Sequence, residues 1–114
     1  MNPEYFVEKV RQGIVEENDL IYRDLFANTD ATEASDEYWK NALELFNSLD
    51  SRGKETLFKI MRQVSVDTVS NLFGVLDGST SLDGVDEEFR LTIDDENGSL
   101  NGDLQDIFLE KEEQ

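Results

Sequence analysis

Seven carboxylates close together in the last third of the sequence are the residues most able to do chemistry. They surround one short segment and the turn that follows it, and they are Asp83, Asp86, Glu87, Glu88, Asp94, Asp95 and Glu96. Carboxylates in such a group can ligate calcium, work as acid–base pairs or contact a basic protein surface. Each possibility makes a different demand on the spacing and on the neighbouring residues.

The spacing around the two nearby glycines argues against an EF-hand calcium loop. Such a loop places Gly sixth, oxygen ligands first, third and fifth, and Glu twelfth. With Gly98 sixth, Ile93 would be first and Leu104 twelfth. With Gly102 sixth, Phe108 would be twelfth. The pattern therefore predicts a carboxylate-rich turn, and we expect neither a metal site nor a cofactor.

The residue types that enzymes use most near neutral pH are missing. The chain has no His and no Cys, which removes the usual proton-transfer and nucleophilic side chains and the ligands of structural zinc. No phosphate-binding sequence of the form G-x-x-x-x-G-K is present. Any two of the 27 acidic residues could stand at the separation used for glycoside hydrolysis, but nothing marks a particular pair. The sequence thus predicts a protein that is not an enzyme.

The charge of the chain is strongly negative and unevenly distributed. With 27 acidic and 10 basic side chains, the 114 residues have a formal net charge of −17. Residues 1–34 have a balance of −5, residues 35–76 of −1 and residues 77–114 of −11. Such a chain repels nucleic acid and anionic lipid and attracts basic proteins. The alternative interpretation is that the carboxylates face water and only keep the protein soluble.

Composition predicts one folded domain in a reducing compartment. A length of 114 residues with seven Phe, three Tyr and one Trp suits a single domain, 1–114, with a modest core. No apolar stretch is long enough to span a membrane, and the first residues lack the basic and apolar regions of a secretory signal. Because Cys is also absent, we expect a cytoplasmic, bacterial protein.

The apolar pattern predicts a mainly α fold of about five helices with one small β-hairpin near the C-terminal end, which is α+β by strict count. A helical part covers 3–77, and the hairpin with a terminal helix covers 86–112. The expected helices are 3–27, 35–49, 54–64, 65–76 and 103–110, and the expected strands are 88–93 and 99–101. The acidic residues would then lie on the first strand, in the loop before it and in its turn.

Local signals set the boundaries of these elements. Asn2 and Pro3 suit the start of the first helix, and Gly13 with the polar residues after it predicts a kink or two shorter helices there. Asn97-Gly98 is the dipeptide favoured in tight hairpins, and Gly78 is a helix stop. The apolar face expected for the first helix is Phe6, Val7, Val10, Ile14, Ile21 and Leu25. The caps expected for later helices are Ser35, Asp50 or Ser51, and Asn101 or Asp103.

Three stretches toward the C-terminal end bear a resemblance to known proteins. They are Ser70–Ser79 (SNLFGVLDGS), Phe89–Leu91 (FRL) and Asn101–Glu110 (NGDLQDIFLE). These stretches are similar to small bacterial proteins of uncharacterised type, some of which resemble immunity proteins of polymorphic-toxin or contact-dependent inhibition systems. The resemblance contains no catalytic signature and transfers no site residue. It implies a small acidic inhibitor.

The sequence therefore predicts an acidic protein that binds a basic protein through its last third, as an immunity or inhibitor protein binds a basic, nuclease-like toxin. Two alternatives stay open. One is a small self-associating structural or adaptor protein that uses apolar helix faces, and the other is an inhibitor that mimics DNA. Because the carboxylates cluster at one end, DNA mimicry is disfavoured. Neither nucleic acid nor a membrane is expected as a partner.

Overall fold

The regular secondary structure is entirely helical in residues 1–94 and 96–113, the parts of the chain that the computed structural model describes. These residues form four helices and a 3₁₀ turn. The first helix is continuous but contains a π-helical segment, so it is labelled in three parts. The elements are α1 (Pro3–Val10), η1 (Arg11–Glu16), α2 (Glu17–Asn28), the 3₁₀ turn η2 (Ala31–Glu33), α3 (Glu37–Asn47), α4 (Ser51–Asp77) and α5 (Leu104–Glu112).

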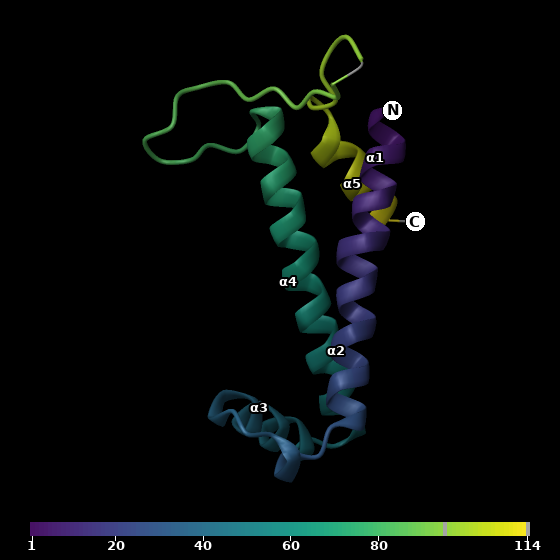
Figure 1. Ribbon diagram of the computed structural model, residues 1–114, viewed down its shortest axis with the longest axis vertical. Helices are drawn as coiled ribbons and strands as arrows, with labels where there is room; N and C mark the ends of the chain where they lie inside the picture. Colours follow the sequence, from purple (N-terminus) through teal and green to yellow (C-terminus); the bar gives the residue numbers. More distant parts are fainter. Residues whose placement is uncertain (95, 114) are drawn as a thin grey trace.

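Two long helices dominate the shape of the molecule. The α1–η1–α2 helix runs beside α4, α3 lies across one end of the pair, and α5 packs against α1 and α4 near the other end (Figure 1). The extents are 53 × 33 × 26 Å and the radius of gyration is 18.0 Å, against about 13 Å for a compact domain of this length. No helix of the described chain is both long and apolar enough to cross a membrane.

Side chains at the helix starts explain where the elements begin. The Asn2 carboxamide oxygen accepts a hydrogen bond from the Tyr5 amide (2.8 Å), with Pro3 in the first turn, as the sequence predicts. The Asp50 carboxylate accepts from the Gly53 amide (2.7 Å) and caps α4, which confirms one of its two predicted caps. For α3 the cap is Asp36 and not Ser35, so that helix begins slightly later than expected.

The two helices predicted over 54–64 and 65–76 are a single helix, α4. The boundary was expected between Val64 and Ser65, but no residue there breaks a helix. Val66 and Phe73, seven residues apart, are buried on one face of the helix, and Phe58, before the expected boundary, is buried about 80° around it. The helix ends where predicted, because Gly78 adopts the left-handed conformation with φ 88°.

The weak point predicted near Gly13 is the π-helical segment η1, and it changes which residues face the core. Val7 and Val15 are eight residues apart, which in an ideal α-helix would rotate them apart by about 80°. A π turn accommodates one extra residue, so the two side chains face the same way, and both are fully buried. The predicted apolar positions Ile14 and Ile21 are exposed instead. The expected face was therefore wrong at Ile14 and Ile21, whereas Leu25 is partly buried against a cluster of buried residues, as expected.

Buried apolar residues form two separate clusters. The upper core lies between α1, η1, α4 and α5 and consists of Val7, Val15, Val66, Phe73, Leu104 and Phe108. The lower core lies between α2, α3 and α4 and consists of Phe26, Leu43, Phe46 and Phe58. Its rings are in close contact, with centroids 5.0 Å apart for Phe26 and Phe46. The helix predicted over 35–49 therefore contributes residues to the lower core and none to the upper core.

The predicted β-hairpin is absent from the described residues. The Leu100 amide donates to the Leu91 carbonyl (2.8 Å), which is a single pairing of the kind a hairpin would have. Beside it the Asn101 side chain takes the place of a backbone partner: its Oδ1 accepts from the Leu91 amide (2.8 Å) and its Nδ2 donates to the Phe89 carbonyl (2.8 Å). Because a side chain satisfies these groups, the alternating segment 88–93 is extended without forming a strand.

Candidate functional site

The predicted acidic residues lie on a long connection between α4 and α5 that we call the acidic loop, residues 79–100. It leaves the end of α4 as a wide arc, returns across the top of the molecule and makes a second, smaller excursion before α5 (Figure 1). Loops of this length without regular structure are uncommon in compact domains and are often functional. Its two ends are held firmly, as the following contacts show.

The first anchor is the last turn of α4. The Gly74 carbonyl accepts hydrogen bonds from the amides of Ser79 (2.9 Å) and Thr80 (3.0 Å). Gly74 is buried, and a Cβ there would lie 2.8 Å from Nε2 of Gln105, so a larger residue would require the Gln105 and Thr80 side chains to shift. Gln105 in turn donates to the Ser70 carbonyl (3.0 Å).

The second anchor joins the end of the loop to the end of α4. Asn101 Nδ2 donates to the Leu76 carbonyl as well as to Phe89. The Asp77 carboxylate accepts from the amides of Gly102 (2.6 Å) and Gln105 (2.8 Å), so it caps α5 from another helix. Neither predicted cap does this, since Asp103 makes no side-chain capping bond. The sequence does contain a signal for this role of Asp77. A carboxylate at the C-terminus of a helix interacts unfavourably with the helix dipole, so its presence there indicates a partner outside that helix.

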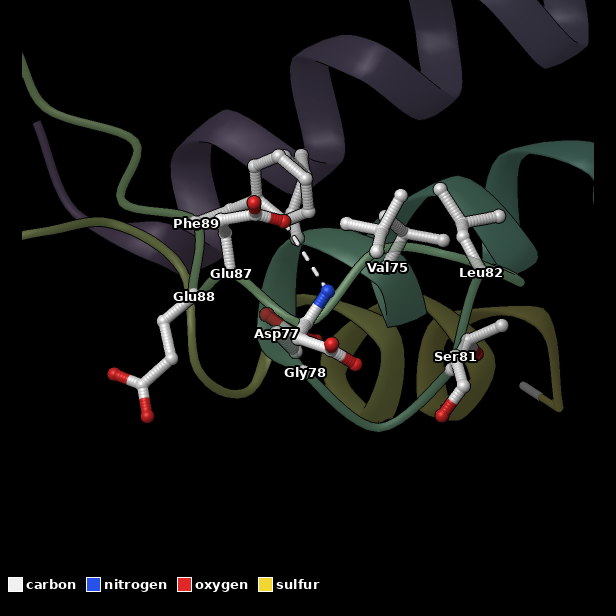
Figure 2. Close-up of a pocket in the computed structure, with 12 residues that line it drawn as sticks. Val75, Asp77, Gly78, Ser81, Leu82, Glu87, Glu88 and Phe89 are labelled. Atoms are coloured by element: carbon white, nitrogen blue, oxygen red, sulfur yellow. Dashed lines mark hydrogen bonds between the residues drawn. The ribbon is translucent and has the colours of Figure 1, made fainter.

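A cavity of about 580 Å³ lies between the arc of the loop and the end of α4 (Figure 2). The loop side contributes three carboxylates and three apolar side chains, namely Asp86, Glu87, Glu88, Leu82, Val85 and Phe89. All six are exposed, including Phe89 at 44%. The Asp86 amide donates to a Glu87 carboxylate oxygen (3.1 Å), whereas the Glu88 carboxylate points away from the other labelled side chains in Figure 2.

The structure brings together some of the predicted site residues and separates others. Asp86, Glu87 and Glu88 share the cavity, and Asp83 is exposed on the same arc without lining it. Asp94 and Glu96 belong to the second excursion, and Glu96 forms an ion pair with the N-terminal ammonium of Met1. Asp95 lies outside the described residues. The site is therefore one arc with four carboxylates and a separate turn.

Sequence reasoning missed the apolar residues of the loop. The alternating pattern predicted that Phe89 would face a sheet and its core, and it gave Leu82 and Val85 no role. All three are exposed beside the cavity. The available signal was the occurrence of large apolar residues inside a segment otherwise rich in Ser, Gly and Asp, because exposed apolar groups that gather in one place mark contact surfaces.

Some carboxylates elsewhere in the molecule are paired with cations, in contrast to those of the arc. At the waist, between the two cores, Arg62 hydrogen-bonds Glu112 (2.9 Å) and Glu16, and Arg11 hydrogen-bonds Glu112 (2.8 Å). Burial opposes ionisation of Glu112, but these bonds outweigh it and hold its pKa below the usual range. Among the described residues, the arc carboxylates take part in no ion pair.

The arc of the loop combines exposed carboxylates with exposed apolar side chains. Within the described ranges, no three acidic side chains converge as the ligands of a metal ion would. The sequence matches no protein-family model, no curated protein and no solved structure. The functional conclusion therefore depends on the residues themselves.

Proposed function

We propose that this chain is a non-enzymatic binding protein that docks the arc of its acidic loop on a basic surface of another protein. The observation that supports this most is the combination on one arc of exposed, unpaired carboxylates and exposed apolar side chains. Specific interfaces have an apolar centre surrounded by polar groups, and aromatic residues often dominate their energy. Phe89, with Leu82 and Val85, would be the centre, and the carboxylates would be the rim.

The two kinds of side chain would serve different steps of binding. Carboxylates attract a positively charged partner over a distance and raise the association rate, most strongly at low ionic strength. Apolar contacts form only after docking and mainly slow dissociation. A loop fixed at Gly74 and at Asn101 would present both without the full entropic cost of ordering a free segment.

The kind of partner that fits best is a basic enzyme such as a nuclease toxin, which makes this chain an immunity or inhibitor protein acting in the cytoplasm. A nuclease cleft is positive because it binds phosphates, and carboxylates can occupy those positions. Fast association is valuable to an inhibitor of such an enzyme.

Affinity capture from the native host with two matched variants tests the proposal. In the loop variant, Asp83→Asn, Asp86→Asn, Glu87→Gln and Glu88→Gln remove four charges from the arc. In the control, Asp24→Asn, Glu33→Gln, Glu37→Gln and Glu44→Gln remove four exposed charges from α2, η2 and α3. We expect the wild type and the control to retain one basic protein at about 50 mM salt and to release it by about 500 mM. The loop variant should not retain it.

Two outcomes would contradict the proposal. One is equal retention of the partner by the loop variant, and the other is retention that does not change with salt. Once a partner is known, Phe89→Ala separates the two roles. We expect this variant to dissociate faster with an almost unchanged association rate, whereas the loop variant should associate more slowly.

A further inference from the structure

The N-terminal half of α4 presents an apolar row that begins at Leu57, which packs partly against the lower core, and continues through the exposed Ile60 and Val64. Leu57, Ile60 and Val64 follow one another at spacings of three and four residues, which places them on one face of the helix. Ile60 is 55% exposed and Val64 60%. Next to the row, Leu45 and Leu49 extend the apolar surface onto α3 and line a groove of about 490 Å³ with Leu57 and Ile60. This surface, Leu45, Leu49, Leu57, Ile60 and Val64, is called the lower apolar face.

We propose that the lower apolar face is where two copies of this chain pair, with their α4 helices antiparallel and crossing at Ile60. The proposal is independent of the acidic loop, which lies at the other end of the molecule (Figure 1). Three observations carry it: the excess surface of the single chain, the distribution of its charge, and the order of the charged residues beside the apolar row.

The single chain exposes more surface than its mass warrants. A folded monomer of 13.1 kDa exposes about 6,400 Å² by the usual scaling with mass. This chain exposes 8129 Å². The excess of about 1,700 Å² per chain falls within the range that each subunit of a stable homodimer buries, about 1,000–2,500 Å². Part of the excess belongs to the acidic loop, and the unpartnered outer sides of the two-helix layer supply the rest.

Charge restricts where two such chains can meet. Each copy has a net charge of −17, so most pairs of surfaces repel. Residues 35–76, which include α3 and nearly all of α4, have a balance of only −1. The lower apolar face lies within this segment. It is therefore the part of the surface that a second copy can approach without strong repulsion.

The order of charges along α4 favours the antiparallel arrangement. With Ile60 against Ile60 of the second copy, Leu57 lies opposite Val64, and Arg52 comes close to Asp67 on each side of the two-fold axis. Arg52 and Asp67 are both exposed and available for this pairing. A parallel arrangement in register would instead bring Arg52 beside Arg52 and Asp67 beside Asp67, which is repulsive.

Sedimentation equilibrium of the whole chain and two matched variants tests the pairing. We expect the wild type to sediment as a dimer of twice 13.1 kDa. Ile60→Asp should raise the dissociation constant on the order of 100-fold or more, because it places a charge at the centre of the interface. Leu72→Asp is the control, since Leu72 is on the same helix and 60% exposed but points about 120° away from Ile60. It should remain a dimer.

Two further variants test the orientation. Arg52→Glu and Asp67→Arg should each weaken the dimer, and the double variant should restore it, which happens only if these residues face each other. Because the chain has no Cys, Ile60→Cys introduces a single thiol that should oxidise to a disulfide-linked dimer. Leu72→Cys should not form this dimer under the same conditions.

The proposal fails if the wild type is a monomer at all concentrations up to several hundred micromolar. It also fails if Ile60→Asp stays dimeric while its circular dichroism is that of the wild type, because pairing must then use another surface. Failure of the double charge variant to recover the dimer overturns the antiparallel arrangement. None of these results bears on the binding of a basic protein by the acidic loop.

Discussion

The two ends of the molecule share the same long helices but differ in what they bury and what they expose. At the upper end, α1, α4 and α5 enclose fully buried residues such as Leu104 and Phe108, and the acidic loop covers the outside. At the lower end, α2, α3 and α4 enclose a cluster rich in phenylalanine, and apolar side chains are exposed. The upper end thus exposes a loop that combines carboxylates with apolar side chains, whereas the lower end exposes an apolar face on α3 and α4. One fold can then offer two separate contact surfaces.

The waist between the ends holds three of the ten basic side chains. Arg11 and Arg62, both partly buried, are engaged with Glu16 and Glu112. Lys111 is engaged with Glu8 (3.3 Å). These cations stabilise the packing of α5 on the long helices, and none of them forms an ion pair with a carboxylate of the arc. The uneven charge of the surface therefore follows from where the few basic residues are placed.

The largest effects on stability are expected from substitutions that remove one buried ring from one core at a time. Phe108→Ala and Phe46→Ala should each lower the free energy of unfolding by about 3–5 kcal/mol, since both rings are buried and each contacts another ring. If the ends are distinct units, hydrogen exchange in the Phe108 variant should rise first in α5, and in the Phe46 variant first in α3. A simultaneous rise throughout both variants would show that the ends unfold as one unit.

A smaller effect is expected at the waist. Arg62→Met removes the partner that Glu112 and Glu16 share, and it should lower the free energy of unfolding by about 1–3 kcal/mol. The lower part of this range is the better expectation because the Arg62 side chain is 30% exposed. Lys40→Met, at an exposed position on α3, is the control and should change stability by less than about 0.5 kcal/mol. Urea denaturation measures both, and equal effects would contradict a role for the waist.

The next effect concerns the anchoring of the acidic loop. Asn101→Ala leaves the Leu76 and Phe89 carbonyls and the Leu91 amide without their partner, at an expected cost of about 1–2 kcal/mol. Limited proteolysis should then cut within 79–100 sooner than in the wild type. Asn97→Ala, in the exposed turn, should leave the cleavage rate as it is. If both variants are cut at the wild-type rate, Asn101 does not hold the loop.

The smallest effect expected is a change in the pH dependence of stability. The pKa of Glu112 is lower in the folded chain than its ordinary value, so its ion pairs stabilise the fold above about pH 4.3. That contribution is lost as the pH falls through the lower, folded pKa. The free energy of unfolding of the wild type should therefore decrease between about pH 5 and pH 2, and Glu112→Gln should reduce this slope. Equal slopes in the two proteins would exclude Glu112 as the source.

Sequence patterns predicted the helices well where local signals were strong. Asn2, Asp50 and Gly78 mark helix ends through their own backbone or side-chain chemistry, and each was identified correctly. The split of α4 was wrong because the polar residue Ser65 was given the role of a boundary although it does not break a helix. The hairpin was wrong because the Asn101 side chain, within the predicted return strand, bonds the Leu91 amide and the Phe89 carbonyl that a backbone partner would have paired.

The candidate site was predictable in composition but not in arrangement. The sequence identified the carboxylates, since charge can be counted without a fold. It could not show that Glu96 pairs with the N-terminus or that Asp77 caps α5, because both contacts join residues far apart in the chain. The exposure of Phe89 was also missed, since alternation alone does not reveal whether a core lies on the other side.

The π-helical segment η1 has a consequence for how this protein tolerates change in length. Most helices are disrupted by the gain or loss of one residue, because every later side chain turns by about 100°. Here an extra residue is already accommodated between Val7 and Val15. Loss of one residue from Arg11–Glu16 would turn this segment into an ordinary α-helix. The apolar faces of α1 and α2 would stay in phase, so a shortened homologue would keep the same architecture.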